Sequence, residues 1–401
     1  MACPVTHSLG TPVKAFDYRN DPGLVTDPWT VFRDLQDAPP LFYSPELGGH
    51  WVASRRDVIL DVLRNSELFS NHQVSVPRVE RAVASIPHHL DPPEHALYRA
   101  GLVRMFSGAV VAALEPDVRV TTKRLLEDFA ADGRCEFVHA FAQRLPVEIF
   151  MRLCGLPLDR REELVSWVES YFHGTTPAEA EAAHEKSIAF LGEWLDCNLA
   201  HPDRAGGHII AALVGGRADG TPLTRAEMLS IVISLFNGGL DTVAAQMSHM
   251  MRYFAENPQA RQVLVDDPAK IPDAVEELLR RFSIISIGRL VTRDKDYQGV
   301  SLKKGDMILL PIGAAGLDAS AFEDPMAVDF DRPDRRKHCA FGSGPHMCVG
   351  APLARLELRI MLEELLPHLP DLAISPDADI RYHTGVTVGM KSLPLQWSTA
   401  S

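Results

Sequence analysis

The sequence predicts a mainly α-helical protein with a smaller β-rich region, folded as a single domain over residues 1–401. Helical periodicity dominates the stretch from Glu94 to Leu213, and a long apolar run follows from Met228 to Met251. Short runs of β-favouring residues then gather in the last third of the chain. Because no repeat, charge run or low-complexity linker separates these regions, we expect them to share one core.

The composition indicates a soluble globular protein without nucleic-acid partners. Hydrophobic residues make up 46% of the chain and charged residues 23%, which is ample for a sizeable core. The net charge of −13 argues against binding to a phosphate backbone. The 6 cysteines lack the spacing of a disulfide framework, and the N-terminus lacks the basic and apolar regions of a signal peptide. We therefore expect a bacterial protein of the cytoplasm without a membrane anchor.

The N-terminal part is expected to be irregular at first and helical afterwards. Residues 1 to about 45 are rich in proline and should wrap around the body of the protein. A short strand is predicted at His50–Ser54 and a helix at Asp57–Arg64. The helical stretch that follows should break at its glycines, namely at Gly133, Gly155–Pro157 and Gly206–Gly207.

A capping box predicts the start of the longest helix. Thr224 and Glu227 have the spacing at which each side chain accepts a backbone N–H of the first helical turn. No breaker follows before Asn257, so the helix should run unbroken for roughly 45–50 Å. Its apolar centre is long enough to span a membrane, but Asn237, Asp241 and other polar residues favour a buried helix of a soluble protein.

Another helix and several short strands are predicted after the longest helix. The helix should cover Ile271–Phe282. The strands of the β-rich region are expected at Arg289–Thr292, at Gly299–Leu302, at Met307–Leu310 and within Thr384–Leu393.

A glycine-rich loop around Cys348 is the strongest chemical signal in the chain. Gly342, Gly344 and Gly350 let the backbone turn tightly around a single sulfur atom. A helix should begin just after this loop, at Ala351, and its free N–H groups and dipole favour the thiolate form of the cysteine. A thiolate held in this way suits one axial position of a haem iron.

Two other roles for Cys348 are a small buried apolar residue and a zinc ligand beside Cys339 and His346. Zinc is disfavoured because no C-x-x-C pair completes the site. The spacing F-G-x-G-x-H-x-C-x-G from Phe341 to Gly350 resembles the haem-thiolate loop of the cytochrome P450 monooxygenases at every fixed position. The resemblance implies haem b as cofactor, Cys348 as the iron ligand, and a triangular fold with haem buried between the oxygen-binding helix and the cysteine-loop helix.

The segment Gly238–Thr242 lies at the centre of the longest helix. Each glycine inside a helix costs about 1 kcal/mol relative to alanine, so two together need a reason, either close helix packing or an opening for a small ligand. The Thr242 hydroxyl can also bond the Gly238 carbonyl and bend the helix. The segment resembles the oxygen-binding motif of the same family, which implies that Thr242 hydrogen-bonds oxygen and that Asp241 relays protons.

Further matches to the family imply cationic partners for the haem propionates. The segment Asp91–Arg99 resembles a D-P-P-E-H-x-x-x-R element, in which His95 and Arg99 share one helix face. Arg289 and His346 match the remaining propionate partners. Each of the four could alone be an ordinary surface charge, but together with the cysteine loop they indicate propionate binding.

An E-x-x-R motif, formed by Glu277 and Arg280, lies between the oxygen-binding segment and the cysteine loop. Taken alone, this spacing fits a solvated surface pair. In the family, an arginine that precedes the cysteine loop joins the pair, and the segment Asp329–Arg332 makes Arg332 the candidate. We expect these residues to hold the core together rather than to take part in chemistry.

The chain is similar, over nearly its full length, to the subfamily of the camphor-hydroxylating bacterial enzyme. The resemblance implies a substrate pocket lined by Val83, Ser234, Asn237, Ile285, Ile287, Val386 and Thr387. The camphor enzyme holds its ketone with a tyrosine, whereas Val83 cannot donate, and a buried unpaired carbonyl costs about 1–3 kcal/mol. Ser234 and Asn237 could supply a polar contact instead. We expect a terpenoid or an ionone-like norisoprenoid as substrate, with camphor itself as the alternative.

Basic residues near the cysteine loop indicate a docking surface for an acidic partner. The segment Arg332–His338 and the residues Arg355 and Arg359 concentrate positive charge in a chain that is acidic overall, although a solvated basic face would look the same. The resemblance implies a [2Fe–2S] ferredoxin fed by an NAD(P)H-dependent reductase. A peroxide-driven peroxygenase usually lacks the acid–alcohol pair Asp241–Thr242, and a non-enzymatic haem sensor would not need it.

Overall fold

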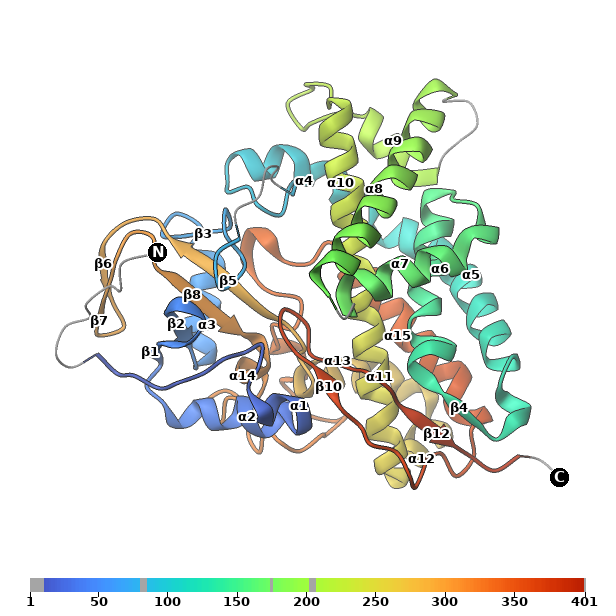
Figure 1. The fold of residues 1–401 in the computed structure, drawn as a ribbon. Coiled ribbons are helices and arrows are strands. Elements are labelled where there is room, and N and C mark those ends of the chain that lie inside the picture. Colours follow the sequence, from blue (N-terminus) through green and yellow to red (C-terminus); the bar gives the residue numbers. More distant parts are fainter. Residues whose placement is uncertain (1–10, 80–84, 174–175, 202–206, 400–401) are drawn as a thin grey trace.

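The computed structural model shows a helical part and a β-rich part, which meet beside a central pair of helices (Figure 1). It describes residues 11–79, 85–173, 176–201 and 207–399. The predicted class, mainly α with a smaller β-rich region, is confirmed. The α-helices are α1 (Pro22–Thr26), α2 (Pro28–Asp34), α3 (Arg56–Arg64), α4 (Glu94–Met105), α5 (Gly108–Glu127), α6 (Arg144–Cys154), α7 (Arg161–His173), α8 (Pro177–Ala200), α9 (Gly207–Val214), α10 (Arg225–Gly239), α11 (Asp241–Glu256), α12 (Pro258–Asp266), α13 (Ile271–Arg281), α14 (Ile312–Gly316) and α15 (Ala351–Leu365).

The strands are short and form several small sheets. They are β1 (Leu41–Ser44), β2 (His50–Ala53), β3 (Phe69–Ser70), β4 (Arg134–Glu136), β5 (Ser286–Val291), β6 (Lys295–Tyr297), β7 (Val300–Leu302), β8 (Met307–Pro311), β9 (Ala373–Ile374), β10 (Tyr382–His383), β11 (Gly389–Met390) and β12 (Pro394–Gln396). The other sheets pair β4 with β12 and β9, β6 with β7, and β10 with β11. Only Gly389–Met390 is a strand within the predicted stretch Thr384–Leu393, so that prediction was too long.

The largest sheet has the strand order β1-β2-β8-β5-β3 and stands on the left of Figure 1. Strands β2 and β8 run parallel, and the other neighbours are antiparallel. Strand β5 begins earlier than predicted because its ladder with β8 continues to Ser286, which lies opposite Pro311. The same ladder sets Arg289 opposite Ile308 at the buried centre of the sheet.

The expectation of an irregular N-terminal wrap was wrong for the described residues after position 10. Asp21 and Asp27 accept backbone N–H groups and cap α1 and α2. Each aspartate is followed by a proline at the first helical position, where the missing N–H costs nothing. The prolines that suggested irregular chain therefore start two short helices, and β1 then adds an edge strand to the main sheet.

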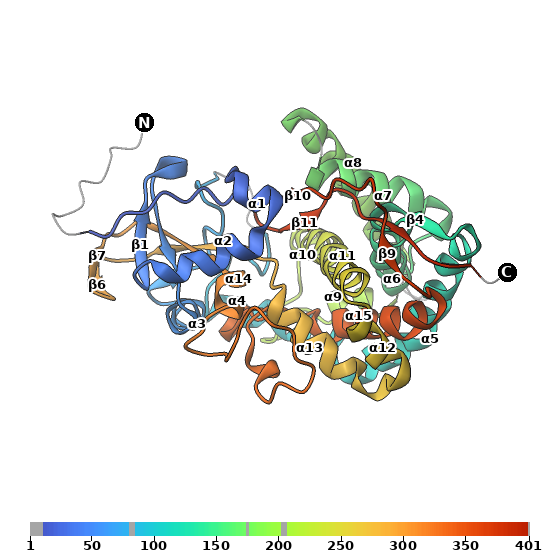
Figure 2. The same cartoon turned by 90° about the horizontal axis from the view of Figure 1, so that it is seen from below.

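The longest predicted helix begins as expected but is interrupted. The capping box of Thr224 and Glu227 is present, with both side chains bonded to backbone N–H groups. At Leu240 (φ −99°, ψ −63°) the regular pattern stops, so α10 and α11 lie end to end through the centre of the helical part (Figure 2). The prediction of one unbroken helix was wrong, because the Thr242 hydroxyl donates to the Gly238 carbonyl, at 3.0 Å, across the break.

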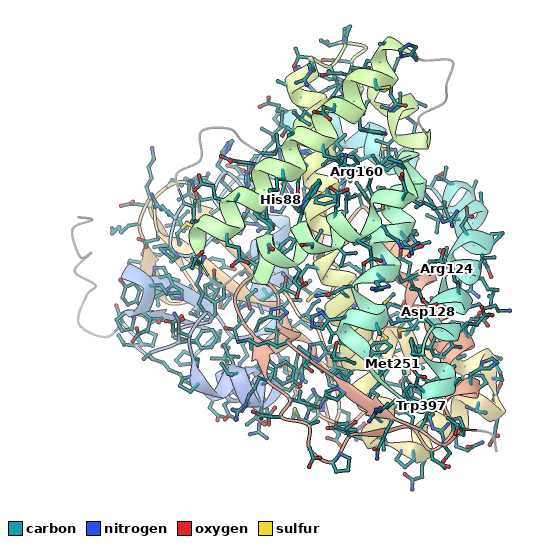
Figure 3. The ribbon with its side chains drawn as sticks, turned by 45° about the vertical axis from the view of Figure 1, so that its right-hand side comes forward. His88, Arg124, Asp128, Arg160, Met251 and Trp397 are labelled. Atoms are coloured by element: carbon teal, nitrogen blue, oxygen red, sulfur yellow. The ribbon has the colours of Figure 1, made fainter. Side chains whose placement is uncertain are left out.

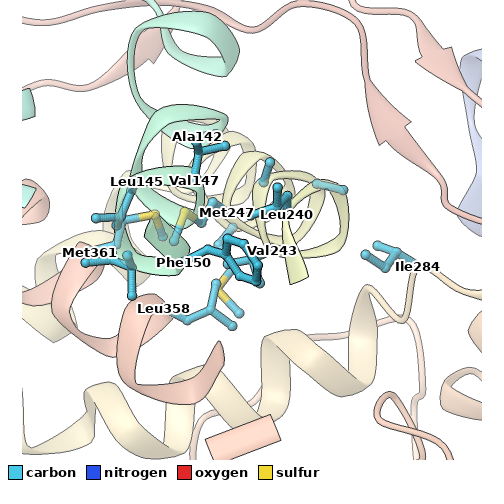
Figure 4. Close-up of a cluster of buried hydrophobic side chains, with 14 of the residues drawn as sticks. Ala142, Leu145, Val147, Phe150, Leu240, Val243, Met247, Ile284, Leu358 and Met361 are labelled. Atoms are coloured by element: carbon cyan, nitrogen blue, oxygen red, sulfur yellow. The ribbon is translucent and has the colours of Figure 1, made fainter. Parts of the chain in front are cut away.

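Apolar side chains of α6, α11 and α15 meet in the helical core. Figure 4 shows Phe150, Val243 and Leu358 facing one another from these three helices. Met251, which follows Val243 by eight residues in α11, is also fully buried (Figure 3). Within the described residues, the stretch Arg225–Glu256 is long and apolar enough to cross a membrane, but half of its most apolar window is buried in the protein. A core helix of a soluble protein meets the same criteria.

Glu277, Arg280 and Arg332 form a buried ion cluster that joins α13 to the chain before the cysteine loop. Arg280 binds the Glu277 carboxylate with two bonds of 2.8 and 2.7 Å, and Arg332 Nε adds a third at 3.0 Å. Glu277 and Arg280 are fully buried. The remaining guanidinium N–H groups donate to backbone carbonyls, including that of Gly316. A solvated surface pair, the alternative for this motif, is excluded.

We predict that Glu277→Gln lowers the free energy of unfolding by about 3–5 kcal/mol, because two buried guanidinium groups lose their only carboxylate. Urea unfolding of the haem-loaded protein at neutral pH measures the loss. Asp331→Asn is the matched control, since Asp331 pairs with Lys270 on the surface and is 77% exposed. The control should cost less than about 1 kcal/mol. An equal loss of unfolding free energy in Glu277→Gln and Asp331→Asn would contradict the prediction.

Candidate active site

A cavity of about 360 Å³ lies between the two central helices and the start of α15. Its walls come from α4, α6, α10, α11, β5 and the loop before α15, and most of them are apolar. The volume is within the range of cavities that hold a cofactor or a small molecule. Residues from both the helical part and the β-rich part therefore converge on one interior space.

Cys348 lines this cavity at the end of the glycine-rich loop. Its backbone N–H donates to the Phe341 carbonyl at 2.8 Å, which closes the loop. Gly342 (φ 74°) and Gly344 (φ 73°) both have left-handed backbone conformations. At Gly344 a Cβ would also lie 3.0 Å from Arg64 Cα, so the loop could not pass α3 with a larger residue.

The pKa of the Cys348 thiol differs from the sequence expectation of a favoured thiolate. Burial raises its pKa, and the N–H groups of Gly350 and Ala351 together with the Arg99 guanidinium only lower it in part. The helix N-terminus therefore favours the thiolate as predicted, but it does not outweigh desolvation in the protein alone. The side chain is nevertheless accessible, because it opens onto the cavity.

The glycines of α10 open the helix toward the same cavity. Gly238, Gly239 and Thr242 all line it. A Cβ built on either glycine meets no heavy atom of another element within 4 Å. Close helix packing, one of the two explanations for the glycines, is therefore excluded, and the structure has an opening beside the Thr242 hydroxyl.

Asp241 lies on a different side of the helix from Thr242. It is 6% exposed and does not line the large cavity. Instead it borders a space of about 10 Å³ together with Gln143 and Glu169, which is the size of a single water molecule. Asp241 and Thr242 lie on different sides because successive residues of a helix point about 100° apart.

Four predicted cationic residues converge at one end of the cavity. His95, Arg99, Arg289 and His346 all line it, and the rings of His95 and His346 lie 4.1 Å apart. Arg99 donates to the Met347 carbonyl beside the cysteine. Within the described part of the chain, His95 Nε2 and His346 Nε2 are buried without a hydrogen-bond partner.

The charges in this group fit an anionic ligand. Burial, together with the neighbouring basic residues His95, Arg289, His88 and Arg99, lowers the pKa of His346 to about 2. Positive charge that disfavours one more cation favours carboxylates. A thiol, partnerless imidazole nitrogens and buried guanidinium groups around one cavity are the donor set that a haem with two propionates requires.

The predicted substrate pocket is only partly brought together. Ser234, Ile285 and Ile287 line the cavity. Val83 lies outside the described residues. Asn237, Val386 and Thr387 are not among the residues that line this cavity. Thr387 is buried in a β-bridge with Ile285, and Val386 is 46% exposed.

Two polar residues of the cavity wall were missed. His88 lines the cavity from the chain between the described residue Ser85 and α4. Glu357 of α15 is buried there, and burial raises its pKa to about 8. An acidic residue within the apolar stripe from Leu356 to Met361 could have indicated Glu357. His88 carries no comparable signal.

The predicted basic docking surface is largely neutralised by carboxylates. Arg355 binds Glu276 at 2.6 Å, and Arg359 binds Glu115 at 2.8 Å. Arg335 and Arg336 both pair with a single aspartate of α13. Positive charge at the surface beside the cysteine loop is concentrated instead on Arg64 and Lys337, both of which are exposed.

The chain is similar to known proteins over its whole length. The family model for cytochrome P450 matches residues 271–397. The chain is 33% identical to a probable cytochrome P450 127A1 of Sinorhizobium fredii, over 96% of this chain and 95% of that protein. It is 31% identical to the mycinamicin IV hydroxylase/epoxidase of Micromonospora griseorubida, over 77% and 79%. The solved structure of cytochrome P450 CYP101C1 superposes with a TM-score of 0.92 at 32% identity, covering 99% of this chain and 100% of that one.

We predict that Glu276→Gln destabilises the protein at neutral pH but not in acid. Burial raises the pKa of Glu276, but hydrogen bonds from His338 and Arg355 outweigh it and bring the pKa to about 2, from an ordinary 4.5. Its stabilising contribution, about 3 kcal/mol, is thus fully present above pH 4.5 and is lost as the pH falls through 2.

Urea unfolding at a series of pH values tests this prediction. The difference between wild type and Glu276→Gln should shrink steadily below about pH 4.5. Glu162→Gln, at a 58% exposed carboxylate, should differ little from wild type throughout. A difference that does not depend on pH would contradict the role of the carboxylate.

Proposed function

Because the chain belongs to the cytochrome P450 family, we propose that it hydroxylates a small, mostly apolar cyclic molecule, a terpenoid or an ionone-like norisoprenoid. As a member of this family, the protein is a monooxygenase with haem b as its cofactor. When bound, haem supplies the activation of O2, so that one oxygen atom enters the substrate and the other leaves as water after uptake of two electrons and two protons. The observation that carries the proposal is the mostly apolar cavity that Cys348 and Thr242 share.

We propose that five side chains hold the cofactor. Cys348 supplies the sulfur ligand to iron, and its loop geometry supports this role, since glycines with left-handed backbone turn the chain around the sulfur. His95, Arg99, Arg289 and His346 bind the propionates. Their convergence at one end of the cavity, with buried nitrogen atoms that lack partners among the described residues, supports this assignment.

Asp241 and Thr242 divide the handling of protons between two sides of one helix. The Thr242 hydroxyl lies at the wall of the large cavity and donates to the Gly238 carbonyl at rest, at 3.0 Å. The Asp241 carboxylate borders the water-sized space on the other side. In this proposal, Asp241 takes protons from that water and passes them toward the Thr242 hydroxyl, which positions oxygen.

The substrate class follows from the composition of the wall. Ile284, Ile285 and Ile287 of the β-rich part face Leu235 and Val243 of the central helices across the cavity. Such walls bind through burial of apolar area, at about 25 cal/mol per Å². A compact cyclic hydrocarbon skeleton suits them. Camphor hydroxylation remains the second candidate.

We predict that the reduced protein shows the far-red-displaced Soret band of a haem thiolate on binding carbon monoxide. Cys348→Ala should abolish this band, because no other cysteine among the described residues lines the cavity and a thiolate is required. Cys339→Ala is the matched control, since Cys339 is buried in the same loop region but does not line the cavity, and it should keep the band.

The same wild-type preparation should convert strongly to high spin with bulky cyclic terpenoids and weakly with camphor. Full conversion by camphor at low concentration would reverse the substrate assignment.

A [2Fe–2S] ferredoxin, reduced by an NAD(P)H-dependent reductase, is the proposed electron donor. The exposed cations Arg64 and Lys337 beside the cysteine loop would face the acidic partner. Arg355 and Arg359 are excluded from this surface by their carboxylate partners.

Charge reversal at Lys337 tests the docking surface. Lys337→Glu should raise the KM for a [2Fe–2S] ferredoxin several-fold at low salt, with little change in kcat, because surface charge acts on encounter rather than on chemistry. Lys186→Glu, on exposed α8, should leave the KM unchanged. An equal rise of the KM for ferredoxin in both variants would contradict the proposed docking surface. Faster turnover with hydrogen peroxide than with ferredoxin would favour a peroxygenase instead.

A further inference from the structure

The small space beside α11 joins Asp241 to polar groups from the side of α6 and α7. This space, of about 10 Å³, has an apolar wall formed by Val147, Val165, Val168, Leu240 and Ala244. Its polar wall residues are Gln143, Glu169 and Asp241. A buried water molecule needs about this volume and two to four polar partners. The space therefore suits one water molecule held between two carboxyl groups and an amide.

A π-helical turn brings the amide of Gln143 to this space. The turn covers Val138–Ala142 and packs against α11. It is closed by the Gln143 N–H, which donates to the Val138 carbonyl at 2.9 Å. His139 Nδ1 lies 2.8 Å from Gln143 Oε1, so the imidazole and the amide are hydrogen-bonded. Such turns are rare and occur frequently at functional sites. Here the turn sets an exposed imidazole against an amide that lines the space.

His139 and Glu169 connect the space with solvent. Their side chains are 49% and 48% exposed, and His139 Nδ1 lies 3.8 Å from Glu169 Oε1. Asp241, by contrast, is 6% exposed. Glu169 thus belongs both to the protein surface and to the wall of the space. A proton that enters from solvent on this side therefore reaches the carboxylate of Glu169 before that of Asp241.

The charged groups next to the π-helical turn are bound elsewhere. Glu136 accepts the backbone N–H of His139 at 2.8 Å. Arg144 Nε donates to the His139 carbonyl at 3.1 Å, and another N–H of its guanidinium reaches Glu162 at 3.4 Å. Neither Glu136 nor Arg144 lines the space. These two residues fix the backbone at His139, and Glu169 is the exposed carboxylate in the wall of the space.

We propose that Glu169 is the proton-entry residue of the enzyme, which takes protons from solvent and passes them to Asp241 through one water molecule in the enclosed space. The inference rests on the proposed function, in which each turnover consumes two protons and Asp241 regains those that it gives up. In each transfer the Glu169 carboxyl gives its proton to the water, and the water gives another proton to the Asp241 carboxylate. Glu169 then takes the next proton from solvent or from His139, while Gln143 positions the water.

Substitutions on α7 test this route in the haem-loaded protein, with β-ionone as substrate, a [2Fe–2S] ferredoxin and an NAD(P)H-dependent reductase. Glu169→Gln should lower kcat several-fold at an unchanged KM for β-ionone. It should also raise the solvent isotope effect on kcat in D2O, because proton entry becomes the slow step. Glu162→Gln, at a 58% exposed carboxylate of the same helix, should change neither quantity. Both variants should keep the wild-type carbon monoxide band, since neither residue lines the large cavity.

A substitution that fills the space tests the water molecule directly. Ala244→Val adds two methyl groups at the wall of the space and leaves both carboxyl groups in place. A crystal structure of the haem-loaded wild type should show an ordered water in contact with Glu169 and Asp241, and the Ala244→Val structure should lack it. The kcat of Ala244→Val should fall as in Glu169→Gln. A space without water in the wild-type structure would overturn the proposal. Should Ala244→Val not fold, the wild-type structure and Glu169→Gln still decide the question.

Asp241→Asn separates this proposal from the function on which it rests. It should lower kcat by about 100-fold, the lower end of what a positioned acid or base contributes. A normal kcat in Asp241→Asn would contradict the proposed role of Asp241 itself. If Asp241→Asn is slow while Glu169→Gln keeps the wild-type kcat and isotope effect, the entry route is overturned and the role of Asp241 stands. If β-ionone is not turned over, the proposed substrate class fails, and the water in the crystal structures decides the route.

Discussion

Buried positive charge around one cavity is the constraint on which the active site depends. Arg289 is 2% exposed in the middle of β5, and among the described residues no carboxylate lies in ion-pair contact with it. A buried cation without a counter-ion is strongly unfavourable. His95 and His346 each add a buried nitrogen atom that lacks a hydrogen-bond partner in the described part of the chain. An anionic cofactor bound here would therefore be stabilised by a nearby cation and by free hydrogen-bonding groups. In the proposed assignment, the propionates of haem b supply the counter-ions that this group lacks.

The geometry of α11 places the side chains of Asp241 and Thr242 on different sides of the helix. Asp241 and Thr242 are adjacent in the chain, so they point in different directions, one to a water-sized space and the other to the large cavity. Leu240 and Val243, the residues before and after this pair, add apolar side chains to the buried cluster (Figure 4). In the proposed function, protons pass along the carboxyl and hydroxyl groups of Asp241 and Thr242.

Features set by local motifs were predictable, and features set by distant partners were not. The capping box at Thr224, the loop around Cys348 and the opening at Gly238 each depend on residues within a few positions, so their spacing in the sequence was enough. The neutralised basic surface depends on Glu276 and Glu115, which lie 79 and 244 residues away from the arginines that they bind. No pattern in the sequence reports such pairs.

The substrate pocket was the least predictable part for a related reason. Most of the residues proposed to hold haem or oxygen lie on helices, on strands or in the short loop before α15, where local backbone hydrogen bonds set each side chain's direction. The turn before α4 and the chain near Thr387 take their direction from contacts made elsewhere in the sequence. Hydroxyl groups of α10 hold the turn before α4 through the side chain of Ser85 and the backbone N–H of Ile86, independently of the ring at position 88. The backbone of this turn can therefore keep its place on α10 while the side chains that it presents to the cavity differ.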